Sequence, residues 1–370
     1  MKKLFQLTAL LIALLLLCGS ALPSALPEAE SIALAIAERT GDKPGEALKN
    51  QEKLPAGSSV CDWLAMALAL GGVRESYGTY LSALEKHVTD AYAGDGCLSR
   101  SKATEYHRIA LTVLALGGDP THFGKKPDGT PVDLVADGTW NFDDPGRQGQ
   151  NGRVYALLLL DAGDYTVPAG GTCTRESLLT DILAVQEPNG GFGLVPGASD
   201  VDITAMTLQA LAPYREQYPA EIDRALEYLA SRLTENCGFF SYGAENAESA
   251  AQTVIALCAL GIDPAVDERF IRGGRTLLDE LDSFRLPDGY SHEPGGEMNI
   301  MATEQVLLAR IACEKRANGV RLYDFSPLSV SAELPESHPT GLYIALGAAL
   351  CLAAAAVLRI RRRKKHAKHD

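Results

Sequence analysis

Residues 186–211 read QEPNGGFGLVPGASDVDITAMTLQAL and carry the clearest indication of the fold. A glycine-aromatic loop, NGGFG, is followed here by an apolar segment with helical character. Loops of this kind occur five times in the chain: DGCLS at 95–99, DGTWNF at 137–142, NGGFG at 189–193, NCGFFSYG at 236–243 and DGYS at 288–291. Asp-Gly and Asn-Gly favour tight turns because glycine adopts positive φ without a Cβ penalty. The aromatic that follows is suited to wedge between neighbouring units.

The loops recur with a nearly constant period. The spacings between their glycines are 42, 53, 47 and 51 residues, measured on Gly96, Gly138, Gly191, Gly238 and Gly289. A period of this length indicates a repeat architecture, in which each unit buries its apolar face against copies of itself.

The loops precede apolar segments rich in Ala and Leu, which predict interior helices. Six such helices are expected, over residues 60–71, 105–117, 153–162, 203–214, 248–261 and 301–315. Amphipathic helices are expected between them, over residues 28–39, 80–91, 131–136, 175–185, 220–233 and 268–284. Six interior helices surrounded by six amphipathic ones predict an all-α fold, an α6/α6 toroid of six outer-inner pairs over residues 28–316. No alternating strand pattern competes with this prediction.

The repeats resemble a known family. Residues 186–211, together with 237–264 and 288–311, look like the prenyltransferase and squalene-cyclase repeat. Protein prenyltransferase β subunits, class II terpenoid cyclases, complement-like thioester domains and cobalamin carriers share its toroid. The resemblance covers about residues 58–314 and implies the fold rather than one activity, because this fold hosts unrelated chemistries.

The ends of the chain predict secretion and a membrane anchor. Lys2 and Lys3, an apolar run over 4–17 and small residues at 19–21 indicate a signal peptide within residues 1–25. The uncharged apolar run 341–358 predicts a transmembrane helix, and the basic tail 359–370 predicts a cytoplasmic end, so the toroid and a stalk over 317–340 face outward. The ends together resemble a Gram-positive surface protein. A split LPxTG-like sequence leaves sortase attachment open beside the favoured retained helix.

Charge and motifs exclude several functional classes. The chain holds 34 Lys and Arg against 47 Asp and Glu, a net charge of −13, which argues against nucleic acid as a partner. It contains no P-loop, no dinucleotide-binding GxGxxG, no HExxH and no GxSxG, so no cofactor is expected. His107 and His292 each stand alone, so no metal site is expected either. The oligomeric state is left open.

Six cysteines lie between the predicted signal peptide and the predicted transmembrane helix, at positions 61, 97, 173, 237, 258 and 313, and none is in CxxC spacing. Cys97, Cys173 and Cys237 lie in loops or at helix starts and are candidates for disulfides in an oxidising compartment. Cys258 and Cys313 lie within apolar helices and are expected to be buried free thiols.

Aligning the interior helices on their LGG and LGIDP ends and on an AxTxxAL pattern predicts two rings of side chains around a cavity. One ring consists of Asp62, Arg108, Arg153, Met206, Gln252 and Gln305, with Tyr155 close by. The other, one turn earlier, consists of Ser58, Thr104, Gly149, Asp202, Glu248 and Met301. Polar groups inside apolar helices cost free energy unless they line a wet cavity or pair with one another, so both arrangements remain open. Helix capping is the alternative role for the acids at 200, 202 and 248.

Asp200-Val-Asp-Ile-Thr-Ala205 resembles the DxDDTA motif of class II terpenoid cyclases, which implies Asp202 as a catalytic acid. Ile203 replaces the next acid of that motif, and aromatic residues make up only 6% of the chain. A thioester is excluded because no Cys-Gly-Glu-Gln run exists. The favoured function is a non-enzymatic, surface-anchored toroid that binds a small molecule, glycan or peptide. The alternative is an enzyme acting on an isoprenoid or a polysaccharide with Asp202 as acid. A purely structural surface module is the third hypothesis.

Overall fold

The computed structural model describes residues 26–241 and 243–325. The chain divides into two units, of which the first ends at Val330 and includes all of these residues. The predicted signal peptide, transmembrane helix and basic tail lie outside the described residues. Within those residues, no helix combines the length and apolar character needed to span a membrane.

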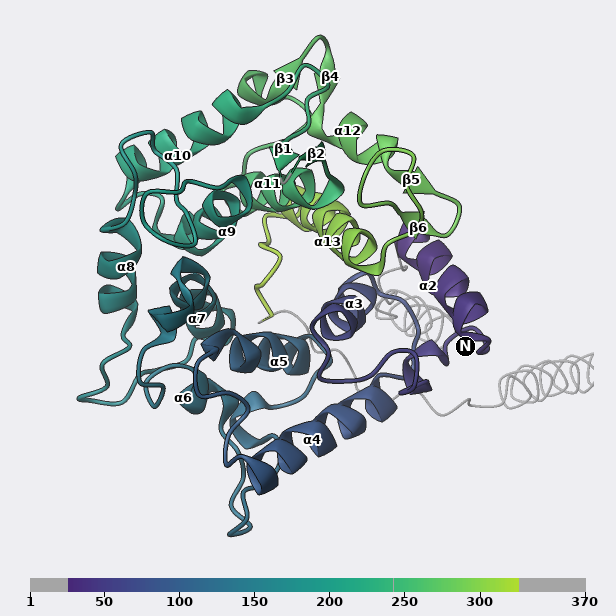
Figure 1. Ribbon diagram of the computed structural model, residues 1–370, viewed down its shortest axis with the longest axis vertical. Helices are drawn as coiled ribbons and strands as arrows, with labels where there is room; N and C mark the ends of the chain where they lie inside the picture. The colour runs from purple at the N-terminus through teal and green to yellow at the C-terminus, as the bar shows by residue number, and fades with distance from the viewer. Residues whose placement is uncertain (1–25, 242, 326–370) are drawn as a thin grey trace, which may run out of the picture. The chain divides into compact units, whose positions relative to one another are not determined.

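Twelve α-helices alternate between an outer and an inner position in the first unit, counted over the described residues (Figure 1). The outer helices are α2 (Pro27–Thr40), α4 (Tyr77–Gly94), α6 (Leu134–Gly138), α8 (Arg175–Leu183), α10 (Pro219–Arg232) and α12 (Leu277–Ser283). The inner helices are α3 (Ser59–Leu70), α5 (Ala103–Ala115), α7 (Gln150–Ala162), α9 (Val201–Leu211), α11 (Ala247–Ala259) and α13 (Ile300–Ala317). The predicted toroid of six outer-inner pairs is therefore confirmed.

The inner helices form a closed ring. Each packs against the next along the chain, and α13 packs against α3. Their composition explains the position: α11 is buried at every residue from Ala247 to Cys258. The outer helix α10 instead buries one stripe, Ile222, Ala225, Leu226 and Leu229, which is the spacing of an amphipathic helix.

The glycine-aromatic loops join each unit to its neighbours. Phe192, Phe239 and Tyr290 are completely or almost completely buried, as the wedge prediction requires. The backbone N–H of Phe192 donates to Thr204 Oγ1 at 2.8 Å, and that of Tyr290 donates to Thr303 Oγ1 at 2.9 Å. A threonine on the following inner helix thus fixes the loop in each of these repeats.

Short elements supplement the helices. Five 3₁₀ turns occur in the described residues: Ala47–Lys49, Pro120–His122, Pro145–Gln148, Ala212–Tyr214 and Glu268–Phe270. Three two-stranded antiparallel hairpins pair β1 (Phe240–Ser241) with β2 (Ala244–Glu245), β3 (Ile271–Arg272) with β4 (Arg275–Thr276), and β5 (Arg285–Leu286) with β6 (Gly289–Tyr290). The helix expected over 268–284 is therefore shorter, because its first half forms a 3₁₀ turn and a hairpin.

The start of the predicted stalk is packed rather than exposed. Beyond α13 the chain turns into the middle of the ring (Figure 1). Leu322, Tyr323 and Phe325 are 2%, 8% and 7% exposed. The Nζ of Lys315 donates to the carbonyl oxygen of Leu322 at 3.0 Å, and burial lowers the pKa of Lys315 to about 8. Residues 320–325 thus belong to the folded unit, because three large apolar side chains gain burial there.

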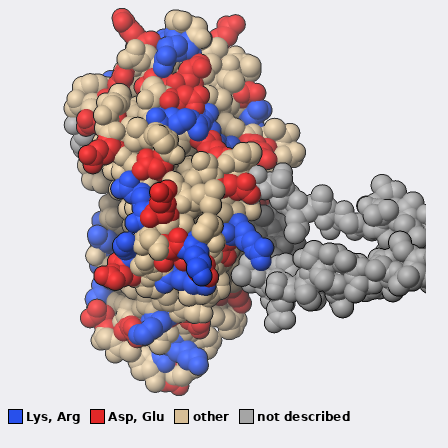
Figure 2. Space-filling view, turned by 90° about the vertical axis from the view of Figure 1, so that its right-hand side faces the viewer, with Lys and Arg blue, Asp and Glu red and all other residues tan. Residues whose placement is uncertain are grey.

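Acidic and basic side chains are interspersed on the face of the unit seen in Figure 2. That face presents both charges side by side rather than one basic field.

Candidate functional site

Two predicted cavity residues form a buried ion pair instead. Asp62 is fully buried, and its Oδ2 accepts from Arg108 Nε at 3.0 Å. Its Oδ1 accepts from Tyr80 Oη at 2.7 Å and from the backbone N–H of Gly57 at 2.9 Å. Burial raises the pKa of Asp62, and the Arg108 guanidinium opposes that rise. The pair joins α3 to α5. Asp62 and Arg108 therefore bond to each other, which is one of the two arrangements left open, and they do not line a cavity.

Arg153 lies on the outer side of the ring, against the prediction. Its guanidinium is 3.9 Å from Asp144 and 3.7 Å from Asp181, on the loop before α7 and on α8. Gly149, which was expected to line the second ring, is the N-cap of α7. The alignment was wrong by two residues on α7, which rotates a side chain by about 200°. This helix carries neither an LGG ending nor the AxTxxAL pattern on which the others were aligned.

Inner-helix residues at the same distance from their N-caps occupy equivalent positions in the ring of helices. Six residues after its N-cap, each inner helix from α5 to α13 places Arg108, Tyr155, Met206, Gln252 and Gln305 in turn. Two residues after the N-cap lie Thr104, Asn151, Asp202, Glu248 and Met301, which we call the mouth ring. Ser58 is itself an N-cap, its Oγ accepting from the backbone N–H of Cys61.

The mouth ring concentrates carboxyl groups. Asp200 caps α9 by accepting from the backbone N–H of Ile203 at 3.0 Å, as the capping alternative predicted. Asp202 has no such role, and its Oδ1 is buried without a hydrogen-bond partner. The pKa of Asp202 is raised to about 6, mainly by burial; Ser249 opposes the rise, and the charges of Asp200 and Glu248 contribute to it.

Glu304 on α13 is a site residue that the sequence alignment missed. It is 2% exposed, and its Oε2 also lacks a partner. Burial, reinforced by the charge of Glu248, raises its pKa well above the usual range for a glutamate. Glu248 itself is 2.8 Å from Nδ1 of His292. Glu304 lies five residues after the N-cap of α13, not two, so it is not a member of the mouth ring. Its burial beside Glu248 follows from how α13 packs, which the sequence pattern did not predict.

Aromatic side chains close the centre of the ring below the mouth. The rings of Trp63 on α3 and Tyr155 on α7 lie 5.8 Å apart at 49°. Burial raises the pKa of Tyr155, and the charges of Glu304 and Asp202 raise it further. Because α7 and α13 face each other across the ring, this coupling places Tyr155 near its middle.

A chain of amides supports the mouth from below. Gln209 Nε2 donates to Gln252 Oε1 at 2.8 Å, and Gln252 Nε2 donates to Gln305 Oε1 at 2.9 Å. Gln252 and Gln305 are thus brought together as the predicted ring requires. Their side chains bond to each other, so these amide groups are already paired. The amide chain holds α9, α11 and α13 in register and fixes the helices that carry the acids.

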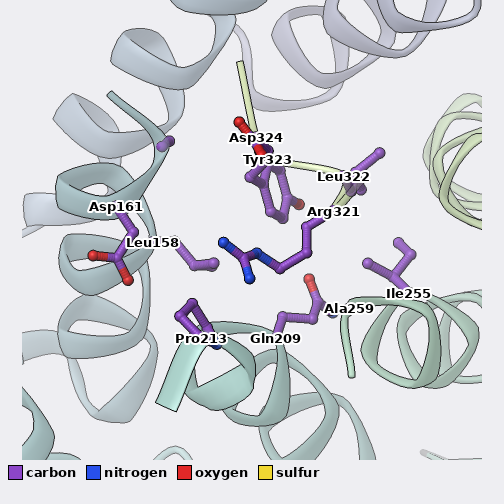
Figure 3. Close-up of a pocket in the computed structure, with 11 residues that line it drawn as sticks. Leu158, Asp161, Gln209, Pro213, Ile255, Ala259, Arg321, Leu322, Tyr323 and Asp324 are labelled. Carbon is purple, nitrogen blue, oxygen red and sulfur yellow. The ribbon is translucent and has the colours of Figure 1, made fainter. Parts of the chain in front are cut away.

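The opposite end of the ring holds a small pocket beside residues 321–324. Its volume is about 100 Å³, and its walls come from α7, α9, α11 and the chain beyond α13. Figure 3 shows Arg321 pointing into its middle, with Gln209 and Pro213 on one side and Leu158 on another. Pockets for drug-sized ligands measure roughly 300–1,000 Å³, so this one suits only a small group.

The histidines do not indicate a metal centre. His107 is fully buried and its Nε2 is 2.6 Å from the carbonyl oxygen of Gly138. Burial lowers the pKa of His107 to about 4, so the ring is neutral at pH 7. Within residues 26–241 and 243–325, no group of three or more His, Cys, Asp or Glu side chains is arranged to hold a metal ion.

Comparison with known proteins gives matches in structure only. No protein-family model matches the sequence, and no curated protein matches it significantly. The chain is similar to ent-copalyl diphosphate synthase from Streptomyces platensis, with a TM-score of 0.45, 18% identity and coverage of 75% of this chain and 53% of that one. It is also similar to Candida albicans protein geranylgeranyltransferase-I complexed with GGPP, with a TM-score of 0.48, 11% identity and coverage of 78% and 91%.

The chain thus spans about half the length of the synthase. Identities of 18% and 11% and TM-scores below 0.5 give no basis for transferring an activity. By its own helices and their closed order, the chain is an α/α toroid of six helix pairs, the fold that the repeat resemblance implies.

Proposed function

We propose that the mouth ring, together with Glu304 beside it, binds a ligand that carries a positively charged amine or guanidine group. The observation that carries the proposal is the pair of buried carboxyl oxygens without partners, Asp202 Oδ1 and Glu304 Oε2. A buried acceptor without a hydrogen bond costs about 1–3 kcal/mol, which a ligand with N–H donors would recover.

The surrounding charges favour a cation over an anion. Asp202 and Glu304 are each coupled electrostatically to Glu248, whose Oε2 lies 2.8 Å from His292 Nδ1. Arg108 is already engaged by Asp62 and Glu105. The faces of Trp63 and Tyr155 add an attraction of about 0.5–2 kcal/mol for a cation placed over them.

The closed centre limits the ligand to a small head group at the mouth. An alkylammonium, a polyamine or the side chain of a basic peptide fits this description, which narrows the predicted small-molecule, glycan or peptide ligand. The outward-facing, membrane-anchored location predicted from the ends of the chain is kept as part of the proposal.

The test is calorimetric titration of the full chain with spermidine at pH 7. We expect saturable binding that Asp202→Asn weakens about tenfold or more, because the substitution removes the ionisable acceptor. The matched control is Asp181→Asn, an exposed aspartate on the outer helix α8. Equal spermidine affinity in wild type and Asp202→Asn would rule out the mouth, and binding of a chito-oligosaccharide instead would indicate a glycan ligand.

An enzyme with Asp202 as acid is the second candidate, favoured by the pKa of Asp202 near 6 and the resemblance of residues 200–205 to a cyclase motif. A general acid works best with a pKa near the operating pH. Protonation of an alkene needs a far stronger acid, and neighbouring Asp200 and Glu248 weaken this one. The test is to incubate the full chain with geranylgeranyl diphosphate and to look for a product by mass spectrometry. A product that Asp202→Asn abolishes would establish that the chain is an enzyme with Asp202 as its acid.

A further inference from the structure

Two cysteine thiols are in contact between adjacent inner helices. Cys258 on α11 and Cys313 on α13 place their sulfur atoms 3.6 Å apart, with the Cys258 thiol donating. The helices that carry them pack directly against each other. Across residues 26–241 and 243–325, this is the only sulfur–sulfur hydrogen-bond contact, although all six cysteines there are free thiols.

The two thiols differ in their surroundings. Cys258 is 4% exposed, whereas Cys313 is partly exposed. Arg310 and Arg316 lie three residues before and after Cys313, on the same face of α13. The hydrogen bond from Cys258, helped by these guanidinium groups, lowers the pKa of Cys313. The same hydrogen bond and burial raise the pKa of Cys258. Cys313 is therefore the better nucleophile and the more accessible one.

The cysteines favoured in the sequence for disulfides have other contacts. Cys237 Sγ donates to the carbonyl oxygen of Phe270 at 3.1 Å, and Cys97 Sγ lies 3.8 Å from the carbonyl oxygen of Asp95. Burial raises the pKa of Cys173 to about 11, which leaves little thiolate at neutral pH.

We propose that Cys258 and Cys313 form a disulfide by exchange with a low-molecular-weight disulfide. The Cys313 thiolate attacks one sulfur of that reagent, forms a mixed disulfide and releases one thiolate. Cys258 then loses its proton, attacks Cys313 Sγ and releases the second thiolate. Two protein thiols are oxidised, and one disulfide of the reagent is reduced to two thiols.

The bond closes a loop of 55 residues and ties the fifth helix pair to the sixth. Because α13 also packs against α3, the cross-link reinforces the helix that closes the ring. Loop closure restricts the unfolded chain, so the oxidised protein should melt roughly 3–10 °C higher than the reduced one.

The test is incubation of the purified full chain with oxidised glutathione, followed by alkylation of the remaining thiols and peptide mapping. We expect a linked peptide pair containing Cys258 and Cys313, and a mass about 2 Da below that of the reduced chain. The two single variants then separate the roles. Cys258→Ser should retain glutathione on Cys313, because no second thiol resolves the mixed disulfide. Cys313→Ser should leave Cys258 unmodified, because that thiol is buried.

Two results would overturn the proposal. One is free Cys258 and Cys313 under conditions in which exposed cysteines have reacted. The other is equal glutathione capture in the two single variants, which would contradict the assignment of Cys313 as the attacking thiol. A linked pair with no rise in melting temperature would overturn the proposed reinforcement of the ring.

Discussion

Replacing Arg108 by Met should destabilise the toroid far more than replacing Arg153 by Met. Arg108→Met leaves Asp62 fully buried, with Tyr80 and the Gly57 N–H as its remaining partners. Removing one member of a buried ion pair costs about 3–5 kcal/mol, because the other charge stays desolvated. For a unit of this size that corresponds to a fall in melting temperature of about 5–15 °C.

Arg153→Met is the matched control. Its two carboxylate neighbours are 3.7 and 3.9 Å away and about half exposed, with side-chain exposures of 59% and 51%. An ion pair of this kind contributes less than about 1 kcal/mol. Circular dichroism melts of the two variants and the wild type at pH 7 measure the difference. A fall in melting temperature below about 2 °C for Arg108→Met, or equal falls for the two variants, would refute the claim that the Asp62–Arg108 pair stabilises the packing of α3 against α5.

Further predictions concern Asp202, Glu304 and Tyr323. The folded-state pKa of Asp202, about 6, lies above the ordinary value of 3.8. The folded protein therefore favours the protonated carboxyl, and the stability that this group contributes at low pH is lost as pH rises through 6. Asp202→Asn should therefore match the wild type at pH 4 and exceed it by about 1–3 kcal/mol at pH 7 in urea unfolding, and equal pH profiles would contradict this. Glu304→Gln should stabilise the protein at high pH in the same assay, since burial raises the pKa of this carboxyl as well. Tyr323→Ala should cost about 3 kcal/mol through the cavity it leaves, and an unchanged unfolding midpoint would show that residues 320–325 do not support the ring.

The helices were predictable because their burial follows from local composition. Segments rich in Ala and Leu became inner helices, and amphipathic stripes became outer ones. The glycine-aromatic loops indicated the repeat because Phe192, Phe239 and Tyr290 in three of them are buried between units. Hairpin β3–β4 was not predictable from periodicity, since a two-residue strand carries too few alternations to be recognised.

The site was predictable only in part, because it depends on helix register. Asp202 and Glu248 were placed together in the mouth ring, since α9 and α11 share the AxTxxAL pattern on which they were aligned. Helix α7 has neither this pattern nor an LGG ending, and its N-cap is a glycine, so Arg153 was assigned the inward position that Tyr155 occupies.

The buried segment after α13 had no signal in the sequence. Residues 320–325 follow a long helix and precede a polar stretch, and nothing local indicates that Tyr323 is buried within the toroid. The Glu304 carboxyl was missed for the same reason, because its environment is built from α7, α11 and α13 together. Long-range packing of this kind cannot be read from one repeat.

The most direct test of the proposed ligand site is the pH dependence of spermidine affinity for wild type and Asp202→Asn. A cation binds the ionised form of Asp202, so ligand binding must displace its proton below pH 6. Calorimetry should give an affinity that rises about tenfold between pH 5 and pH 7 for the wild type and little for Asp202→Asn. The same pH dependence in both proteins, or an affinity that falls as pH rises, would contradict a cation site built on Asp202.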